Sequence, residues 1–297
     1  MSRRGAWSEG GTQMAGKLID IHPHVISPDE ARYPRAPLGG ILSDWARDRP
    51  ITPDQMIKAM DEAGVTRSAL VHASTCYGYD NSLVVDAVRA HPDRFAGVFS
   101  VDVLREDAPA QIRKWVDLGL SCLRLFTTGS TMPDQAGWLD DPRSFPAWEC
   151  VQELNIPVCV QMHMQGMSQL HTLLKRFPSA VIILDHLASP DTRDGAPYAA
   201  AQPLFDLAPN PNVFLKVTIR NVRMIAEGGG DFQPYFRRVV DVFGASRIAW
   251  GSNFPTSDAS LSRIVAESRE ALAFLTQEER AWIFHRTAER LYPSLAC

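Results

Sequence analysis

Two histidines separated by one proline are the first residues along the chain that could perform chemistry together. They stand in the segment Ile19-Asp-Ile-His-Pro-His24, whose apolar start predicts a short β-strand that ends at Pro23. Residues i and i+2 of an extended chain point to the same side, so His22 and His24 are expected to face one space. Two imidazoles placed in this way could hold a divalent metal ion or polarise a substrate.

Other polar residues stand where further predicted strands end. His163, His186 and Asn253 each follow a short apolar run. In a barrel of parallel strands, functional groups gather at the carboxyl ends of several strands. Each histidine alone could be a hydrogen-bonded residue of the core, but four histidines at three strand ends favour one shared site. There His163 would contact the substrate, while His186 and Asn253 would take part in catalysis.

Basic side chains near these strand ends could bind an anion. Arg124 lies in one predicted strand, Lys216 ends another, and Arg220 follows in the next loop. Because guanidinium binds carboxylates through paired hydrogen bonds, these residues predict a small anionic substrate. The alternative is that Arg124 and Lys216 pair with structural carboxylates. Ser74 and Tyr77, after the second predicted strand, offer hydroxyl groups that could orient the substrate.

Eight short and continuously apolar runs supply the strands that must position these residues. They are 18–22, 68–72, 95–101, 122–125, 158–161, 181–184, 213–216 and 248–250. Most intervals between them are long enough for one crossover helix, and unbroken apolar runs are typical of a sheet buried on both faces. An α/β fold is therefore predicted, a single (β/α)₈ TIM barrel in regular or distorted form. A doubly wound open sheet is the rival, which the lack of a GxGxxG motif after the first strand disfavours.

Local signals predict helices between the strands and a long loop after the first strand. Thr52, followed by Pro53, caps a helix that ends at Gly64. The interval 25–51, which contains Trp45 and several arginines, is expected to cover or line the active site. The alternative for this interval is a tolerated surface insertion.

Length and composition fit one globular domain. The chain has 297 residues, of which 45% are hydrophobic and 22% charged, and a barrel of this kind needs roughly 250 residues. Residues 17–297 are expected to form the barrel domain and residues 1–16 a flexible arm, with Met14 as an alternative start.

The charge pattern and the cysteines limit the partners and the compartment. A net charge of −4 without a basic run disfavours nucleic acid, and no apolar run reaches the roughly 18 residues of a membrane span. Five cysteines without CxxC spacing favour a reducing compartment, with the cytoplasm as the expected location. The sequence leaves the oligomeric state open, a homo-oligomer included.

Taken together, these positions resemble the amidohydrolase superfamily, in particular its amidohydrolase-2 branch. That branch includes 2-pyrone-4,6-dicarboxylate lactonases, sugar-acid lactonases and sulfomuconolactone hydrolases, and more distantly metal-dependent decarboxylases. The resemblance runs from about residue 17 to the end of the chain. The segments that carry it are Ile19-Asp-Ile-His-Pro-His24, 74–81, Gly119-Leu-Ser-Cys-Leu-Arg124, Leu184-Asp-His186 and Trp250-Gly-Ser-Asn-Phe-Pro255.

This resemblance implies two alternative kinds of site. In metal-dependent members the ligands of one divalent ion, zinc as the first choice, would correspond to His22, His24, His163 and Asn253. In lactonases that work without a metal, the groups that bind and activate the substrate would correspond to His22, His24, His186 and Asn253. The sequence therefore leaves open whether the protein uses one divalent metal ion or none.

One position departs from the family pattern. The residue at the end of the eighth strand is usually aspartate, and here it is Asn253, whose amide is a poor metal ligand and cannot act as a base near neutral pH. The predicted base is then His186, because imidazole titrates near the working pH. No lysine follows the fourth predicted strand at a place where its carbamate could bridge two metal ions, and Arg124 occupies that strand. A two-metal site is therefore disfavoured. The first hypothesis is hydrolysis of a lactone, in which water attacks a carbonyl polarised by His22 and His24.

Two further hypotheses stay open at this stage. A metal-dependent nonoxidative decarboxylase of an aromatic or enol acid would need firm metal ligation, and Asn253 disfavours it. A catalytically weakened barrel that only binds an anionic metabolite would explain Asn253 directly. Turnover of lactones distinguishes the first hypothesis from the other two.

Overall fold

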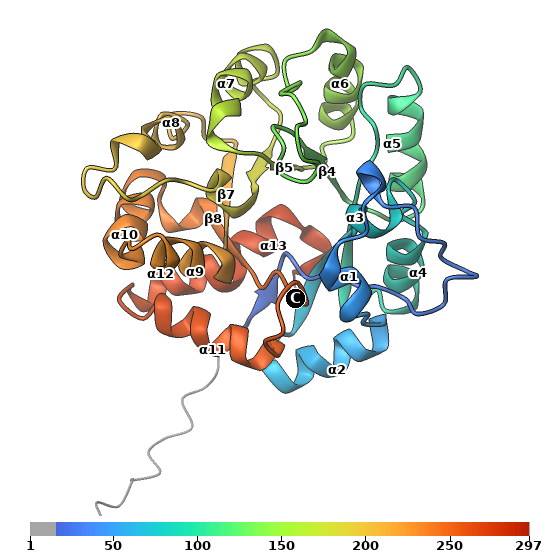
Figure 1. The fold of residues 1–297 in the computed structure, drawn as a ribbon, viewed down its shortest axis with the longest axis horizontal. Helices are drawn as coiled ribbons and strands as arrows, with labels where there is room; N and C mark the ends of the chain where they lie inside the picture. The colour runs from blue at the N-terminus through green and yellow to red at the C-terminus, as the bar shows by residue number, and fades with distance from the viewer. Residues whose placement is uncertain (1–15, 297) are drawn as a thin grey trace, which may run out of the picture.

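Each of the eight apolar runs forms a strand of one parallel sheet, which closes into a barrel inside a ring of helices (Figure 1). The computed structural model describes residues 16–296, so the predicted arm and its alternative start at Met14 lie almost entirely outside the described residues. The strands are β1 (Ile19–Asp20), β2 (Arg67–Val71), β3 (Phe95–Phe99), β4 (Cys122–Phe126), β5 (Val158–Gln161), β6 (Ile182–Leu184), β7 (Val213–Thr218) and β8 (Ile248–Gly251). Neighbours in sequence are neighbours in the sheet. The backbone N–H of Ile21 donates to the carbonyl of Trp250 at 3.2 Å and joins the first strand to the last. The predicted TIM barrel is therefore confirmed.

Helices follow the strands and cover the outside of the barrel. The α-helices are α1 (Asp44–Asp48), α2 (Pro53–Ala63), α3 (Ser74–Tyr77), α4 (Ser82–Ala90), α5 (Ala108–Asp117), α6 (Phe145–Glu153), α7 (Met167–Arg176), α8 (Gln202–Phe205), α9 (Ile219–Glu227), α10 (Phe232–Phe243), α11 (Leu261–Ala271), α12 (Gln277–Ala281) and α13 (Thr287–Leu291). The short 3₁₀ turns are η1 (Leu38–Gly40), η2 (Pro142–Ser144), η3 (Met164–Gly166), η4 (Asp185–Ala188), η5 (Ala199–Ala201), η6 (Ala245–Arg247) and η8 (Pro293–Leu295), and η7 (Trp282–Arg286) is a π-helical turn.

The capping signals at α2 work as the sequence predicted. The Thr52 hydroxyl accepts the N–H of Gln55, whose side chain accepts the N–H of Thr52 in return. Pro53 opens the helix, and Gly64 ends it with a positive φ of 72°, a conformation that glycine adopts without strain. Local sequence therefore determines both ends of this helix.

The barrel interior is layered because alternate residues of each strand point inward. A lower, apolar layer contains Cys122, Cys159, Ile183 and Phe214. Two residues further along the same strands lie Arg124, Gln161, Asp185 and Lys216. The polar layer lies nearer the carboxyl ends of the strands, which is where the mouth of the barrel begins.

The loop 25–51 packs over one side of this mouth. The backbone N–H of Ser43 donates to the carbonyl of Thr75 at 3.4 Å. The Arg49 guanidinium donates to the carbonyls of Pro255 and Thr256 at 2.9 and 3.0 Å. The loop thus joins the segments that follow β2 and β8.

Within residues 16–296, the structure has no helix with both the length and the apolar character that a membrane crossing needs.

Candidate active site

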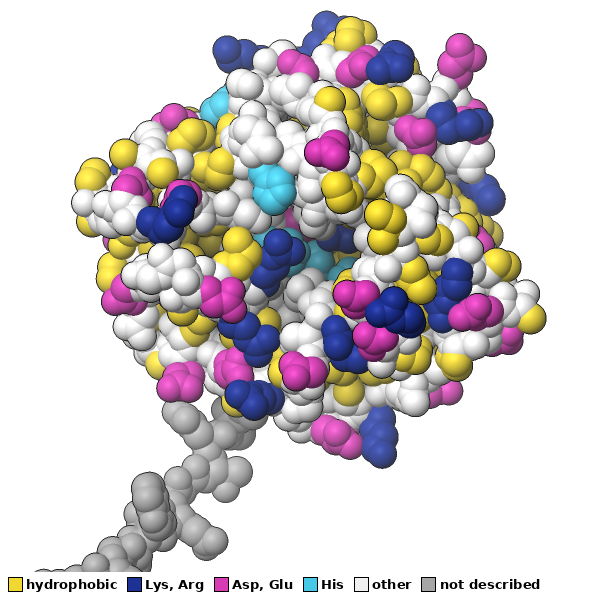
Figure 2. Space-filling model, viewed as in Figure 1, with side chains coloured by type: hydrophobic (Ala, Val, Ile, Leu, Met, Phe, Trp, Pro, Cys, Tyr) yellow, Lys and Arg dark blue, Asp and Glu magenta, His cyan; other side chains and the backbone are white. Residues whose placement is uncertain are grey.

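A cavity of about 480 Å³ opens at the carboxyl ends of the strands. Figure 2 shows it as a hollow in the middle of this face, with histidine and basic side chains at its base. Six of the residues that the sequence singled out line it: His24, Ser74, Arg124, His186, Arg220 and Asn253. Segments up to 229 residues apart in the chain therefore meet in one space, since the interval from His24 to Asn253 spans the barrel.

His24 presents an unprotonated ring nitrogen to the cavity. Its Nδ1 lies 2.8 Å from the carbonyl of Val71 on β2, so Nδ1 carries the proton and donates it. Burial, aided by the nearby Arg124 guanidinium, lowers the pKa of His24 to about 3. The neutral ring consequently offers Nε2 as a hydrogen-bond acceptor.

His186 presents an acceptor as well, from an unusual backbone. Residues 186–189 all have positive φ, between 51° and 56°, a left-handed turn that costs about 1–2 kcal/mol per non-glycine residue. The Nδ1 of His186 lies 2.8 Å from the Thr218 hydroxyl, which donates in turn to Asn221 at 3.3 Å. Nδ1 must therefore carry the proton, and Nε2 is left with its lone pair. Burial is the main cause that lowers the pKa of His186 to about 3. The ring is therefore neutral at the working pH, and the reason for which the sequence favoured it as the base, titration near that pH, does not hold.

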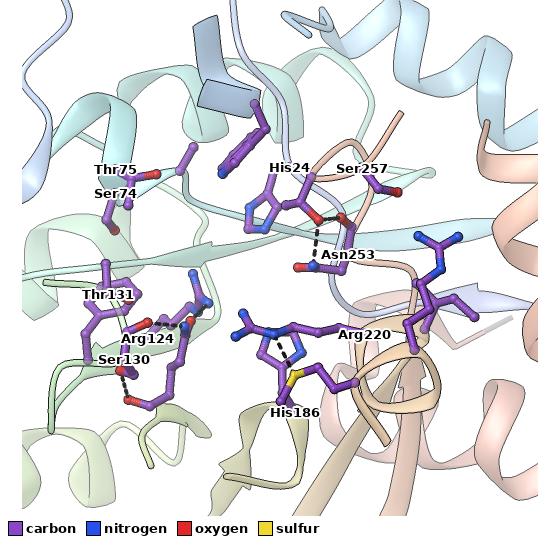
Figure 3. Close-up of a pocket in the computed structure, with 18 of the residues that line it drawn as sticks. His24, Ser74, Thr75, Arg124, Ser130, Thr131, His186, Arg220, Asn253 and Ser257 are labelled. Atoms are coloured by element: carbon purple, nitrogen blue, oxygen red, sulfur yellow. Dashed lines mark hydrogen bonds between the residues drawn. The ribbon is translucent and has the colours of Figure 1, made fainter. Parts of the chain in front are cut away.

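Asn253 presents a carbonyl oxygen rather than an N–H group. Its amide nitrogen donates to the Thr256 hydroxyl at 2.6 Å, and this hydroxyl donates back to the Asn253 backbone carbonyl. With its nitrogen engaged, the side chain turns Oδ1 into the space that His24 and His186 also face (Figure 3). Its φ of 59° is in the left-handed region, which asparagine tolerates better than most residues.

Arg124 and Arg220, two of the three arginines that line the cavity, differ in how they are paired. Arg124 donates from Nε to Asp185 at 2.9 Å and also bonds Gln161. Arg220 contacts the Met224 sulfur at 3.2 Å, and no acidic side chain of the described residues forms an ion pair with it. Burial and repulsion from Arg124 lower the pKa of Arg220, although a guanidinium stays charged at neutral pH. The cavity therefore holds a cation without its anion.

Beneath the cavity floor lies a fully buried charge cluster made of Asp185, Lys216 and His22. The Lys216 ammonium is 2.7 Å from Asp185 Oδ1, 3.0 Å from His22 Nδ1 and 3.4 Å from Cys159 Sγ. Lys216 and His22 have no exposed surface and do not line the cavity. Arg124 and Lys216 both form ion pairs with Asp185. Their main contacts are therefore those of the alternative considered from the sequence, in which the two residues pair with a structural carboxylate.

His163 and Tyr77 lie outside the cavity lining. The half-buried His163 precedes the turn η3, and its backbone N–H donates to Thr128 at 2.8 Å. The Tyr77 hydroxyl accepts hydrogen bonds from the backbone N–H of Ser27 and from Arg35, at 2.9 and 2.7 Å. Tyr77 therefore fastens the loop 25–51 to the barrel.

Three residues that sequence reasoning gave no role are important for the site. Asp185 forms ion pairs with both Arg124 and Lys216. Its position directly before His186 at a strand end was the feature of the sequence that could have indicated its role. Asp20 accepts the backbone N–H groups of His22 and Ser252, at 2.9 and 2.8 Å. A Cβ at Gly251 would lie 2.5 Å from the Cβ of His22, so only glycine lets β8 approach the histidine pair.

The donor set does not fit the divalent metal ion that the resemblance raised. His163 does not line the cavity that His24 and Asn253 share, Asn253 is neutral, and His22 Nδ1 faces an ammonium group at 3.0 Å. Within the described part of the chain, no three His, Cys, Asp or Glu side chains are arranged to hold a metal ion. The chemistry of this site is therefore described through its own side chains.

A (β/α)₈ barrel with histidines, arginines and a polar strand-eight residue at its mouth has the arrangement that the sequence resemblance implied. The family model described as Amidohydrolase matches residues 19–294, and the chain belongs to that family. This confirms the resemblance drawn from the motifs and makes the protein an amidohydrolase-family hydrolase.

Comparison with characterised proteins gives distant lactone-directed relatives. An L-fucono-1,5-lactonase of Burkholderia ambifaria is 27% identical over 247 residues, 80% of each chain. A 2-pyrone-4,6-dicarboxylate hydrolase of Comamonas testosteroni is 26% identical over 261 residues, 80% of this chain and 76% of its own.

Solved structures show the same fold. A Pseudomonas putida protein assigned as a 2-pyrone-4,6-dicarboxylic acid hydrolase has a TM-score of 0.76 at 23% identity, covering 95% of this chain and 99% of its own. An Acinetobacter baumannii protein with the same assignment, solved with citric acid bound, has a TM-score of 0.73 at 20% identity, covering 93% and 99%. At these identities the likeness establishes the barrel.

Proposed function

We propose that this protein hydrolyses the lactone ring of a small anionic molecule. Water adds to the ring carbonyl, the acyl C–O bond breaks, and the product is a hydroxy acid. The names of two relatives, a fuconolactonase and a pyrone-dicarboxylate hydrolase, support a lactone as the substrate class. The citric acid bound to the A. baumannii protein, which has the same fold, supports an anionic ligand.

The observation that carries the proposal is the meeting of two acceptors and one unpaired cation in a single cavity. The Nε2 of His186 and the Oδ1 of Asn253 are free to accept protons or hydrogen bonds from a water molecule. The Arg220 guanidinium faces the same space. Hydrolysis of an anionic ester needs a site of this kind, which activates water beside an anchored anion.

Binding of the substrate anion follows from the charges around the cavity. Arg124, which lines the cavity, shares its carboxylate partner Asp185 with Lys216, so its positive charge is only partly compensated. Arg220 adds a second positive charge without an ionic partner among the described residues. Bidentate contact between a carboxylate and the Arg220 guanidinium would satisfy that charge and fix the ring in position.

Water attack follows from the two free acceptors. Asn253 Oδ1 accepts one hydrogen bond and orients the water, while His186 Nε2 takes its proton as the general base. Arg124, which holds the positive charge at the cavity floor, stabilises the oxyanion. The resulting imidazolium of His186 then gives its proton to the leaving ring oxygen, and the neutral ring is restored.

The test is a panel of lactones that includes a carboxylated pyrone, a muconolactone and sugar-acid lactones. The wild-type protein is expected to open at least one of them. His186→Asn should lower kcat at least a hundredfold, the lower end for loss of a general base, with unchanged circular dichroism. The matched control is His171→Asn on α7, remote from the cavity. Turnover that survives in His186→Asn would reject this base, and saturable binding of the acids without any turnover would establish a binding protein instead.

A further inference from the structure

Helix α9 presents charged side chains to the cavity at helical spacing. It begins directly after β7, at the mouth of the barrel, and its residues Arg220, Arg223, Met224 and Glu227 line the cavity. Residues three, four and seven positions apart lie on one side of an α-helix, so these side chains form one row. From Arg220 to Glu227 the helix rises about 10 Å. Among the described residues, Glu227 is the one acidic side chain of the cavity lining, at the far end of this row.

The exposed carboxylate of Glu227 lacks a cationic partner. Its expected partner one turn earlier, Arg223, donates instead to Glu267 on α11 at 2.7 Å. Arg193, which lies beside the end of α9, is paired with Asp191 at 2.6 Å. Within residues 16–296, no hydrogen bond or ion pair involves the Glu227 carboxylate. Because Glu227 also lies at the negative end of the helix dipole, neither pairing nor helix stability accounts for an acidic residue there.

We propose that Glu227 is a specificity-determining residue, which selects a lactone with one anionic end and hydroxyl groups at the opposite end. The proposal rests on the proposed lactone hydrolysis and names the substrate class within it. Figure 3 shows Arg220 beside His186, so an anion held at Arg220 directs the rest of the substrate along α9 toward Glu227. There the two carboxylate oxygens accept hydrogen bonds from neighbouring hydroxyl groups, whereas they repel a second carboxylate.

The neutral part of the cavity lining fits a hydroxylated substrate. Six of its side chains carry hydroxyl groups: Ser74, Thr75, Ser130, Thr131, Thr256 and Ser257. The hydroxyl groups of Thr131 and Ser257 make no hydrogen bond to any other described residue. A hydroxyl group both donates and accepts hydrogen bonds, so these walls can pair with substrate hydroxyls that an apolar wall would leave without partners.

The expected strength of the selection follows from the exposure of Glu227. Two like charges about 5 Å apart at a solvent-exposed rim repel enough to weaken binding about fivefold. Salt screens exposed charges, so the effect should shrink to less than about twofold in roughly 0.5 M salt. Steric exclusion does not depend on salt in this way, and the salt dependence therefore separates repulsion by charge from a lack of space.

The experiment is isothermal titration calorimetry with gluconate and glucarate, open-chain acids that contain no lactone ring to hydrolyse. They differ at one end only, where gluconate has a hydroxymethyl group and glucarate a second carboxylate. In Glu227→Gln, the ratio of the Kd for glucarate to the Kd for gluconate is expected to fall about fivefold at low salt. The matched control is Glu62→Gln, which removes the same charge from an exposed position of α2 at the opposite end of the barrel, and it should leave the ratio unchanged.

Several outcomes would overturn the role of Glu227. They are an unchanged ratio in Glu227→Gln, an equal change in Glu62→Gln, a change that persists in high salt, and no saturable binding of either acid at millimolar concentrations. Kinetics supply a second readout, because the preference in kcat/KM between mono- and dicarboxylated lactones should move in the same direction as the Kd ratio. If the wild type opens no lactone, the proposed function fails, while calorimetry still decides the role of Glu227.

Discussion

At the residue scale, hydrogen-bond partners divide three neighbouring imidazoles between two roles. His24 and His186 donate through Nδ1 and turn lone pairs to the cavity, whereas His22 accepts through Nδ1. Neutral His24 can therefore accept a hydrogen bond from water but cannot polarise a carbonyl, the role that the sequence suggested for it. The spacing in His22-Pro23-His24 gives the two histidines the same expected role. Only their hydrogen-bond partners in the fold show that their roles differ.

Burial of His186 predicts an activity profile that extends to acid pH. Its pKa is lowered from 6.5 to about 3, so the base form persists well below the pH at which a free imidazole is half protonated. The value of kcat/KM, which reports the free enzyme, is expected to stay within twofold between pH 7 and pH 5. Initial rates are measured after rapid dilution from pH 7, with a carboxylate substrate that remains ionised. A half-loss near pH 6.5 would mean that His186 titrates as in water.

The orientation of Asn253 predicts how its substitutions differ. Asn253→Ala removes the acceptor that orients the water, so kcat should fall about tenfold, the value of one hydrogen bond of about 1.4 kcal/mol. Asn253→Asp keeps an acceptor at the same place, so kcat should stay within about threefold, while its negative charge opposes the substrate anion and raises KM. Steady-state kinetics of the two variants test this. Equal loss of kcat in both would show that the amide N–H, not the oxygen, is used.

At the element scale, the sequence was sufficient for the barrel and for the strand ends. Continuous apolar runs indicated all eight strands, and His24, His186 and Asn253 lie in the cavity because the carboxyl ends of parallel strands meet at one mouth. The sequence could not show at which depth of the barrel each inward-pointing residue lies. Lys216 ends a strand in the sequence, yet Thr218 is the residue of β7 that reaches His186, while Lys216 stays one layer below.

The turn after β6 is another feature that propensities do not reveal. Residues 186–189 adopt the left-handed conformation without a glycine, and strain of this kind is concentrated at functional sites. The backbone carbonyl of His186 is held by Asn221 Nδ2 at 2.7 Å, so α9 contributes to keeping the turn in place. The position of the base is thus determined by tertiary contacts rather than by its own segment.

Strain in this turn predicts that one glycine substitution stabilises the protein. Ser189 has a φ of 53° and is half-buried. Ser189→Gly removes about 1–2 kcal/mol of left-handed strain and adds about 0.5–1 kcal/mol of unfolded-chain entropy. The free energy of unfolding should therefore rise by about 0.5–1 kcal/mol in urea titrations. Ser168→Gly in α7 is the control, and it is expected to lower the free energy of unfolding by about 0.5 kcal/mol. Equal destabilisation by the two substitutions would show that the turn is not strained.

At the scale of the whole molecule, the charge of the cavity is opposite to that of the chain. The chain carries a net charge of −4, yet three arginines and only one acidic residue line the cavity, and Figure 2 shows basic and histidine side chains at the hollow. Exposed charges are screened beyond about 10 Å in ordinary salt, so an anion is attracted by the arginines of the cavity only when it is close to the mouth. Recognition of the substrate is therefore a local property of the mouth.

Burial of neutral histidines predicts that the fold is weakened by acid well above the range in which carboxylates titrate. In the folded protein the pKa values of His24 and His186 are about 3 and that of His72 is about 4, against about 6.5 in the unfolded chain. Between these values the unfolded chain binds more protons, so stability is complete above pH 6.5 and is lost as the pH falls toward 3. At pH 5 each of these histidines costs about 2 kcal/mol relative to pH 7.

Asp20 acts in the opposite direction and supplies the control. Burial raises its pKa from 3.8 to about 6, so the folded protein takes up this proton first and regains about 1.4 kcal/mol at pH 5. The free energy of unfolding in urea should thus be several kcal/mol lower at pH 5 than at pH 7. His24→Asn is expected to shrink this difference by about 2 kcal/mol, and Asp20→Asn to enlarge it by about 1.4 kcal/mol. Variants that change the difference in the same direction would contradict the protonation states on which the proposed chemistry depends, since a His24 that is charged at neutral pH could not accept a hydrogen bond from water.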